Sequence, residues 1–78
     1  MSVKRCVVTF PSTTGAMAME AACMDSGTPG RLIPIPRSIT AGCGLCWAAP
    51  IADREAVEAV VRREKLEFDG VYEIEFPR

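Results

Sequence analysis

The sequence predicts an α+β fold, a ferredoxin-like sandwich in which two helices cover one face of a four-stranded antiparallel sheet. Two observations favour it. Along the 78 residues, segments with strand and helix periodicity follow the order β-α-β-β-α-β, which is the order of that fold. The second strand segment, residues 31–37, contains two prolines, which suit the sheet edge that the second strand occupies in this topology. The length fits one domain, which we place at residues 1–78.

The first strand is expected over residues 4–10. Cys6, Val8 and Phe10 occupy alternate positions there, as in a strand with at least one buried face. Pro11 follows directly and is expected to end the strand.

The first helix is expected between residues 11–14 and Gly27. The hydroxyl side chains at its start can cap the N-terminus. Met17, Ala21 and Met24 recur at helical spacing, which predicts a helix. Neighbouring stripes contain Ala16, Met19, Glu20 and Cys23. Gly27 can end the helix because glycine readily adopts the left-handed conformation of a C-cap.

The second and third strands are predicted at residues 31–37 and 44–49. Pro34 and Pro36 lie two positions apart, so the missing N–H groups fall on the same side of the strand and leave that side unpaired. Residues 38–42 are the expected loop between the strands.

The second helix is predicted over residues 53–66, with Asp53 as its cap. Its expected apolar stripe consists of Val57, Val60 and Val61. Two charge pairs at i,i+4 spacing are expected on its exposed side, Arg54 with Glu58 and Glu58 with Arg62.

The last strand follows a turn at Asp69-Gly70. Tyr72, Ile74 and Phe76 alternate along it, and we expect them to face the core.

Size and composition narrow the classes of function. The net charge is −1, there is no histidine, and no basic tract appears, so neither nucleic acid nor a membrane is an expected partner. The hydrophobic content of 49% and charged content of 24% are typical of a globular protein. No apolar run approaches the ~20 residues of a membrane span and no signal peptide is apparent, so we expect a cytoplasmic protein. No cofactor is expected.

Four cysteines are the main candidates for chemistry. Cys6 and Cys23 are expected in the core as small apolar residues. Cys43 lies between Gly42 and Gly44, which favour an accessible loop, whereas Cys46 falls inside the predicted third strand.

The predicted topology places Cys43 at the sheet end where the first helix begins. Ser12 and Thr13 at that helix start offer backbone N–H groups and the positive end of the helix dipole. Arg37, at the end of the second strand, would add a positive charge to the same rim. We therefore expect Cys43 to have a lowered pKa and more thiolate at neutral pH.

The spacing of Cys43 and Cys46 leaves other chemistry open. Three extended residues span roughly 10 Å, whereas a disulfide needs Cα atoms within about 7 Å. Gly44 allows a tighter turn, so a dithiol redox pair or a site for a soft ion such as Cu(I) remains an alternative. A third alternative is a non-catalytic interaction domain that docks a partner through its proline-rich edge.

The chain also resembles the selenium/sulfur carrier-like family of small bacterial domains. Four segments carry the resemblance: residues 8–13 (VTFPST), Ala16-Met17 with Glu20, residues 30–37 (GRLIPIPR) and residues 41–45 (AGCGL). The resemblance implies a carrier that holds sulfur or selenium as a persulfide or selenopersulfide on Cys43. Donor and acceptor proteins would be its partners, and the protein an accessory without turnover of its own. Cys46 is not a regular part of the family pattern, and its position in this sequence alone makes it a candidate resolving thiol that releases the cargo through a transient disulfide.

Overall fold

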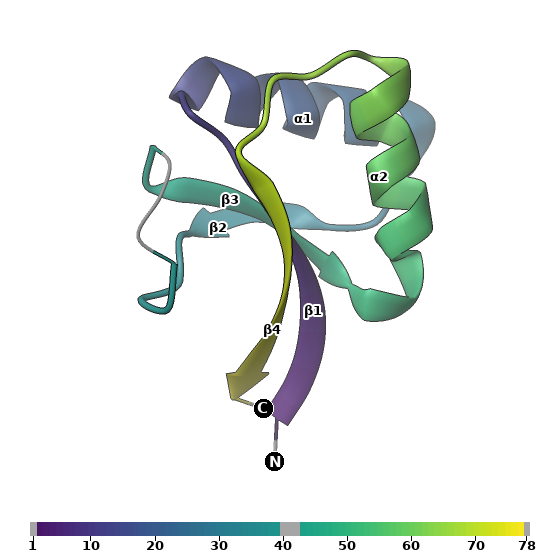
Figure 1. The fold of residues 1–78 in the computed structure, drawn as a ribbon. Coiled ribbons are helices and arrows are strands. Elements are labelled where there is room, and N and C mark those ends of the chain that lie inside the picture. Colours follow the sequence, from purple (N-terminus) through teal and green to yellow (C-terminus); the bar gives the residue numbers. More distant parts are fainter. Residues whose placement is uncertain (1, 40–42, 78) are drawn as a thin grey trace.

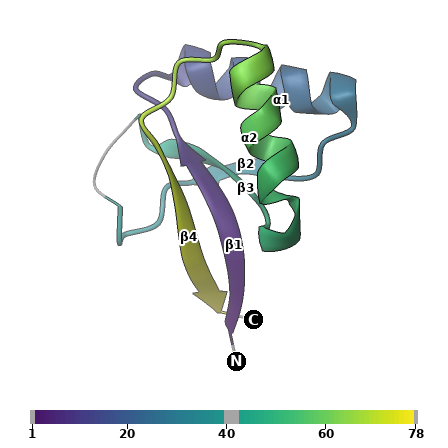
Figure 2. The same ribbon diagram turned by 45° about the vertical axis from the view of Figure 1, so that its right-hand side comes forward.

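The computed structural model describes residues 2–39 and 43–77, and in it four strands form one sheet with two helices on one face (Figure 1). The strands are β1 (Ser2–Thr9), β2 (Arg31–Pro34), β3 (Leu45–Pro50) and β4 (Gly70–Pro77). The helices are α1 (Thr13–Ser26) and α2 (Arg54–Arg63), and a short 3₁₀ turn, η1 (Ile51–Asp53), precedes α2. Figure 2 shows both helices on the same side of the sheet.

The strand order confirms the ferredoxin-like prediction. The order across the sheet is β2-β3-β1-β4, and each neighbouring pair is antiparallel. β2 lies at an edge, as its prolines predict. β2 is shorter than expected, since it ends at Pro34.

Helix α1 begins and ends where the sequence predicts. Ser12 is the N-cap, and its side-chain oxygen accepts a hydrogen bond from the backbone N–H of Gly15. Gly27 is the C-cap, with φ of 74°, and its N–H donates to the carbonyl oxygen of Cys23. Glycine adopts this left-handed conformation without steric cost.

Helix α1 buries the neighbouring stripe rather than the one through Met17, Ala21 and Met24. The helix buries Ala16, Met19 and Cys23, whereas Met17 is 57% and Met24 75% exposed. Apolar residues occur on most sides of this helix, so the sequence contains more than one candidate stripe. The fit of the helix against the sheet selects among them.

This packing predicts opposite effects for two methionines of the same helix. Met19→Ala should lower the free energy of unfolding by about 2–5 kcal/mol, because Met19 is fully buried and its truncation leaves a cavity. Met17→Ala should change it by less than about 0.5 kcal/mol. Urea unfolding followed by circular dichroism measures both. A larger loss for Met17→Ala would contradict the observed helix orientation.

Helix α2 keeps its predicted stripe but differs at its ends. Val57, Val60 and Val61 are buried, as expected. The helix ends at Arg63 rather than at residue 66. Asp53 occupies the N-cap position without a side-chain hydrogen bond, because it belongs to η1 and lacks the extended backbone of a capping residue.

One of the two predicted charge pairs on α2 is present. Arg54 Nε lies 3.6 Å from Glu58 Oε1. Arg54 also pairs with Glu73 of β4. No ion pair joins Glu58 to Arg62, both of which lie in the described part of the chain.

The last strand differs from expectation in the face that its apolar residues occupy. Tyr72 lies opposite Val7, and Ile74 lies opposite Arg5. Both therefore point away from the helices, because residues paired across a sheet share a face. The same holds for Phe76, and Tyr72 is 37% exposed. The prediction that these residues face the helix-covered core is wrong.

The sheet consequently has an apolar cluster on each face. The larger one lies under the helices and includes Cys6, Val8, Phe10, Met19 and Trp47. The smaller one lies on the opposite face, where Val7, Ile39, Cys46 and Ala48 are buried, with Ile33, Ile35, Ile74 and Phe76 packed against them.

Candidate functional site

Cys43 is held at the end of β1 by its own backbone. Its N–H donates to the carbonyl oxygen of Phe10 at 3.0 Å. The adjacent Gly44 carbonyl accepts from Ile35 N–H at 2.9 Å, which extends the β2–β3 pairing to this point. Since Phe10 lies two residues before Ser12, Cys43 is at the sheet end where α1 begins, as the topology predicts.

The Cys43 side chain is half-buried, and its thiol is free. It packs against the edge of the helix-side cluster. Its S–H donates a weak hydrogen bond to the carbonyl oxygen of Leu45, with a sulfur–oxygen distance of 3.8 Å. Gly44 follows with φ of 95° and open space where a side chain would be. The Cys43 side chain is therefore packed on one side and partly exposed.

The start of α1 supplies the polar surroundings of this end of the sheet. Ser12 and Thr13 are exposed there. The first N–H groups of a helix lack intrahelical partners and carry the positive end of its dipole. An anion near this end is favoured by that partial charge.

Arg37 lies in the turn that follows β2, exposed and three residues after the end of that strand. It belongs to a turn that Ile39 N–H closes by donating to the Pro36 carbonyl oxygen at 3.0 Å. Ile39 packs on the sheet face away from the helices, and this turn lies on that side in Figure 1. Among the hydrogen bonds of residues 2–39 and 43–77, none joins Arg37 to Cys43. Gly42, the other expected site residue, is outside the described residues.

Cys46 belongs to the smaller apolar cluster, on the sheet face away from the helices. It is fully buried beside Val7, Ile39 and Ala48, on the face opposite to the one that Cys43 packs on. Burial raises the pKa of Cys46 to about 11, with a smaller contribution from Cys43. Cys46 is therefore a protonated, enclosed thiol at neutral pH, poorly suited to attack a bond on Cys43.

The remaining cysteines, Cys6 and Cys23, are fully buried in the helix-side cluster, as predicted. Burial raises the pKa of both thiols. Cys43 is thus the only one of the four cysteines with an exposed part. Within the described ranges, no group of three or more acidic, cysteine or histidine side chains is arranged to hold a metal ion.

The pKa of Cys46 predicts a loss of stability at high pH. Its thiol stays protonated in the folded state up to about 11, whereas the unfolded thiol ionises near 9.0. As the pH rises from about 9 to about 11, the Cys46 thiol ionises in the unfolded chain but not in the folded protein. This lowers the free energy of unfolding by about 2–3 kcal/mol. Urea unfolding across this pH range should show the decline, and Cys46→Ala should reduce its slope. If the stability of Cys46→Ala declined with pH as steeply as that of the wild type, the raised pKa of Cys46 would be contradicted.

Fold and site together define a small α+β domain with one approachable thiol beside a helix start. The family model described as "Putative Se/S carrier protein-like" matches residues 5–73. The chain belongs to this family. No curated protein and no solved structure matches the chain. No helix among the described residues is both long and apolar enough to cross a membrane.

The sequence singles out Cys43 as a candidate but does not predict the groups that hold it. The carbonyl groups of Phe10 and Leu45, which accept from the Cys43 N–H and S–H, are backbone atoms and carry no side-chain signal. The antiparallel register of β1 and β3, in which Thr9 faces Cys46, is what brings them to this position.

Proposed function

We propose that this protein carries sulfur or selenium on Cys43, as a persulfide or selenopersulfide, between donor and acceptor proteins. The family to which the chain belongs supports this role. The observation that carries it is the exposure of Cys43, since the other three cysteines are fully buried. A carrier needs such a thiol on an open surface, where two larger proteins can reach it in turn.

The loading step balances without an oxidant. The Cys43 thiolate attacks the terminal sulfur of a donor protein's cysteine persulfide. A new sulfur–sulfur bond forms at Cys43 while the sulfur–sulfur bond of the donor breaks, and the donor cysteine leaves as a thiolate. Delivery repeats the step, with an acceptor nucleophile attacking the outer sulfur and Cys43 leaving.

We propose that the start of α1, beside Cys43, stabilises the negative charge on the sulfur. The N-terminal end of α1, at Ser12 and Thr13, favours negative charge on the thiolate and on the outer sulfur of the persulfide. Gly44 adds no side chain next to Cys43, and none of the described atoms lies within 4 Å of the place that a methyl group added at Gly44 would take. We assign no direct contact to Arg37, which lies in the turn after β2.

A one-thiol mechanism follows from the position of Cys46. Release through a Cys43–Cys46 disulfide would require Cys46 to leave the cluster in which it is buried. We therefore propose that the acceptor protein, rather than Cys46, removes the cargo. The protein would then act as an accessory in the cytoplasm, where thiols are kept reduced.

Mass spectrometry of the intact protein tests the proposal. The reduced protein is incubated with a low-molecular-weight persulfide, desalted and analysed, first intact and then after digestion. We expect a mass increase of one sulfur atom located on the peptide that contains Cys43, removed by dithiothreitol. A selenium donor in a parallel sample shows which element is held more stably. No adduct, or an adduct on Cys46, would contradict the proposal.

A further inference from the structure

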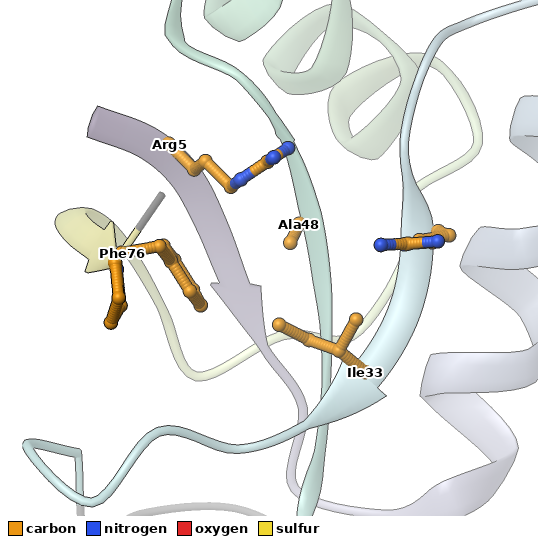
Figure 3. Close-up of a pocket in the computed structure, with 6 residues that line it drawn as sticks. Arg5, Ile33, Ala48 and Phe76 are labelled. Atoms are coloured by element: carbon orange, nitrogen blue, oxygen red, sulfur yellow. The ribbon is translucent and has the colours of Figure 1, made fainter. Parts of the chain in front are cut away.

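The sheet face away from the helices contains a hollow of about 230 Å³ (Figure 3). The residues that line it are Arg5, Arg31, Ile33, Ala48, Phe76 and Pro77. They come from all four strands. The hollow is therefore a feature of the assembled sheet rather than of one loop.

The register of the strands places a small residue between two arginines. Arg31 of β2 lies opposite Ala48 of β3. On the other side of β3, Ala48 lies opposite Val7 of β1, and Arg5 is the next residue of β1 on the same face. The methyl group of Ala48 leaves space between the longer side chains. Figure 3 shows the Arg5 side chain reaching toward Ala48.

The floor of the hollow is apolar. Ile33, Ala48 and Phe76 belong to the smaller cluster or pack against it. The Arg5 guanidinium lies 5.9 Å from the centre of the Phe76 ring, a cation–π contact that helps to orient it. A ligand here would meet positive charge above an apolar surface.

The acidic side chains of β4 do not balance the charge of the two arginines on this face. Glu73 and Glu75 of β4 lie opposite Cys6 and Lys4, so both point to the helix side of the sheet, and Glu73 pairs with Arg54. Within residues 2–39 and 43–77, no ion pair or side-chain hydrogen bond involves Arg5 or Arg31.

We propose that this hollow binds a small organic anion. Its carboxylate or phosphate group would lie between Arg5 and Arg31, whose planar guanidinium groups match both anions in bidentate geometry. Its short apolar part would pack on Ile33, Ala48 and Phe76. The volume lies below that of typical drug-sized pockets, which fits a ligand of few atoms. A second copy of the chain is disfavoured as occupant, because the two arginines of each copy would face each other.

The site is separate from the carrier thiol. Arg5 lies opposite Pro50 at the end of β3, whereas Cys43 precedes Leu45 at the start of the same strand. The hollow also lies on the face away from the helices, whereas Cys43 packs against the cluster under the helices. The proposed binding of an anion in the hollow therefore does not depend on whether Cys43 carries sulfur.

Nuclear magnetic resonance titration of the ¹⁵N-labelled full chain tests the proposal. The probes are benzoate and phenyl phosphate, with benzyl alcohol as the neutral analogue and inorganic phosphate as the head group alone. We expect saturable shifts of the backbone amides around Arg5, Arg31 and Ala48 with one or both aromatic anions. Benzyl alcohol and inorganic phosphate should bind at least about tenfold more weakly, since each lacks one half of the interaction. Equal binding of benzyl alcohol, or no saturable shift with either anion, would overturn the proposal.

Single substitutions distinguish binding in this hollow from a nonspecific attraction of anions to positive charge. Arg31→Gln should weaken binding of the better probe by about tenfold, because a charge-assisted hydrogen-bond pair is lost. Arg31 is exposed on an edge strand, so this variant should fold, and its amide spectrum checks that directly. Lys4→Gln is the matched control, since it removes one positive charge from the opposite face of β1. Equal losses in Arg31→Gln and Lys4→Gln would overturn the proposal, as would shifts centred away from the hollow.

Discussion

Cys43→Ser is expected to abolish sulfur loading, while Cys46→Ala leaves it close to the wild-type level. The reason is access. Cys43 is half-buried at the surface, whereas Cys46 is fully enclosed and burial raises its pKa to about 11. A serine hydroxyl at position 43 cannot form a persulfide at all. Each variant is incubated with the same low-molecular-weight persulfide, and the loaded fraction is read from the intact mass.

Folding controls make this comparison interpretable. Cys43→Ser changes a side chain at the cluster edge, and circular dichroism should show an unchanged fold. Cys46→Ala removes a buried sulfur and should lower the free energy of unfolding by about 1–2 kcal/mol without unfolding the protein. Loading that survives in Cys43→Ser would contradict the assignment of the carrier thiol. Loading lost in Cys46→Ala, with the fold intact, would restore a two-thiol mechanism.

Gly30→Ala is expected to destabilise the protein by about 3 kcal/mol or more, from backbone strain and overpacking together. Gly30 has a φ of 133°, a conformation that residues with a side chain rarely adopt. An added methyl group would lie 2.6 Å from Trp47 Cε2 and 2.9 Å from the Ala48 carbonyl oxygen, both too close for van der Waals contact. Trp47 is 2% exposed and cannot move away without disturbing the core.

Gly27→Ala is the matched control for Gly30→Ala. Gly27 also has a positive φ, 74°, but no atom lies within 4 Å of the position of an added methyl group. Only the conformational cost of about 1 kcal/mol is therefore expected. Urea unfolding followed by Trp47 fluorescence measures both variants. Equal effects would show that backbone strain, rather than contact with the indole ring, dominates at Gly30.

The topology could be predicted because local and long-range signals agree in this chain. The alternation of Cys6, Val8 and Phe10, the cap residues Ser12 and Gly27, and the prolines of the second strand each restrict a different element. All are compatible with one strand order, and that order is observed. Local signals suffice here because capping and proline effects act within a few residues of their source.

The faces of individual elements were harder to predict. In α1, Met17 and Met19 are equally apolar, yet the first is exposed and the second is fully buried. In β4, Ile74 and Phe76 pack on the second cluster rather than under the helices. In α1 apolar residues occur on most sides of the helix, so several stripes compete for burial. In β4 the apolar residues share one face, and the pairing of Ile74 with Arg5 turns that face away from the helices. Burial is then decided by the partner strands and by the orientation of the helix.

The candidate site could also be predicted only in part. The flanking glycines make Cys43 the candidate thiol, which stays a prediction, and its location near the start of α1 follows from the strand order. Arg37 could not be placed, because it lies in a turn whose direction depends on where Ile39 packs. The hollow between Arg5 and Arg31 gave no signal along the chain, since its residues are far apart in sequence.

The sequence by itself determined the order of the elements and the edge position of β2, since each depends on neighbouring residues. The tertiary structure decided which apolar cluster Cys43 and Cys46 each pack against. It also decided that Arg5 and Arg31 share one hollow. The physical reason is register: pairing β3 between β2 and β1 sets which side each side chain takes, and a shift of one residue would reverse every one of them.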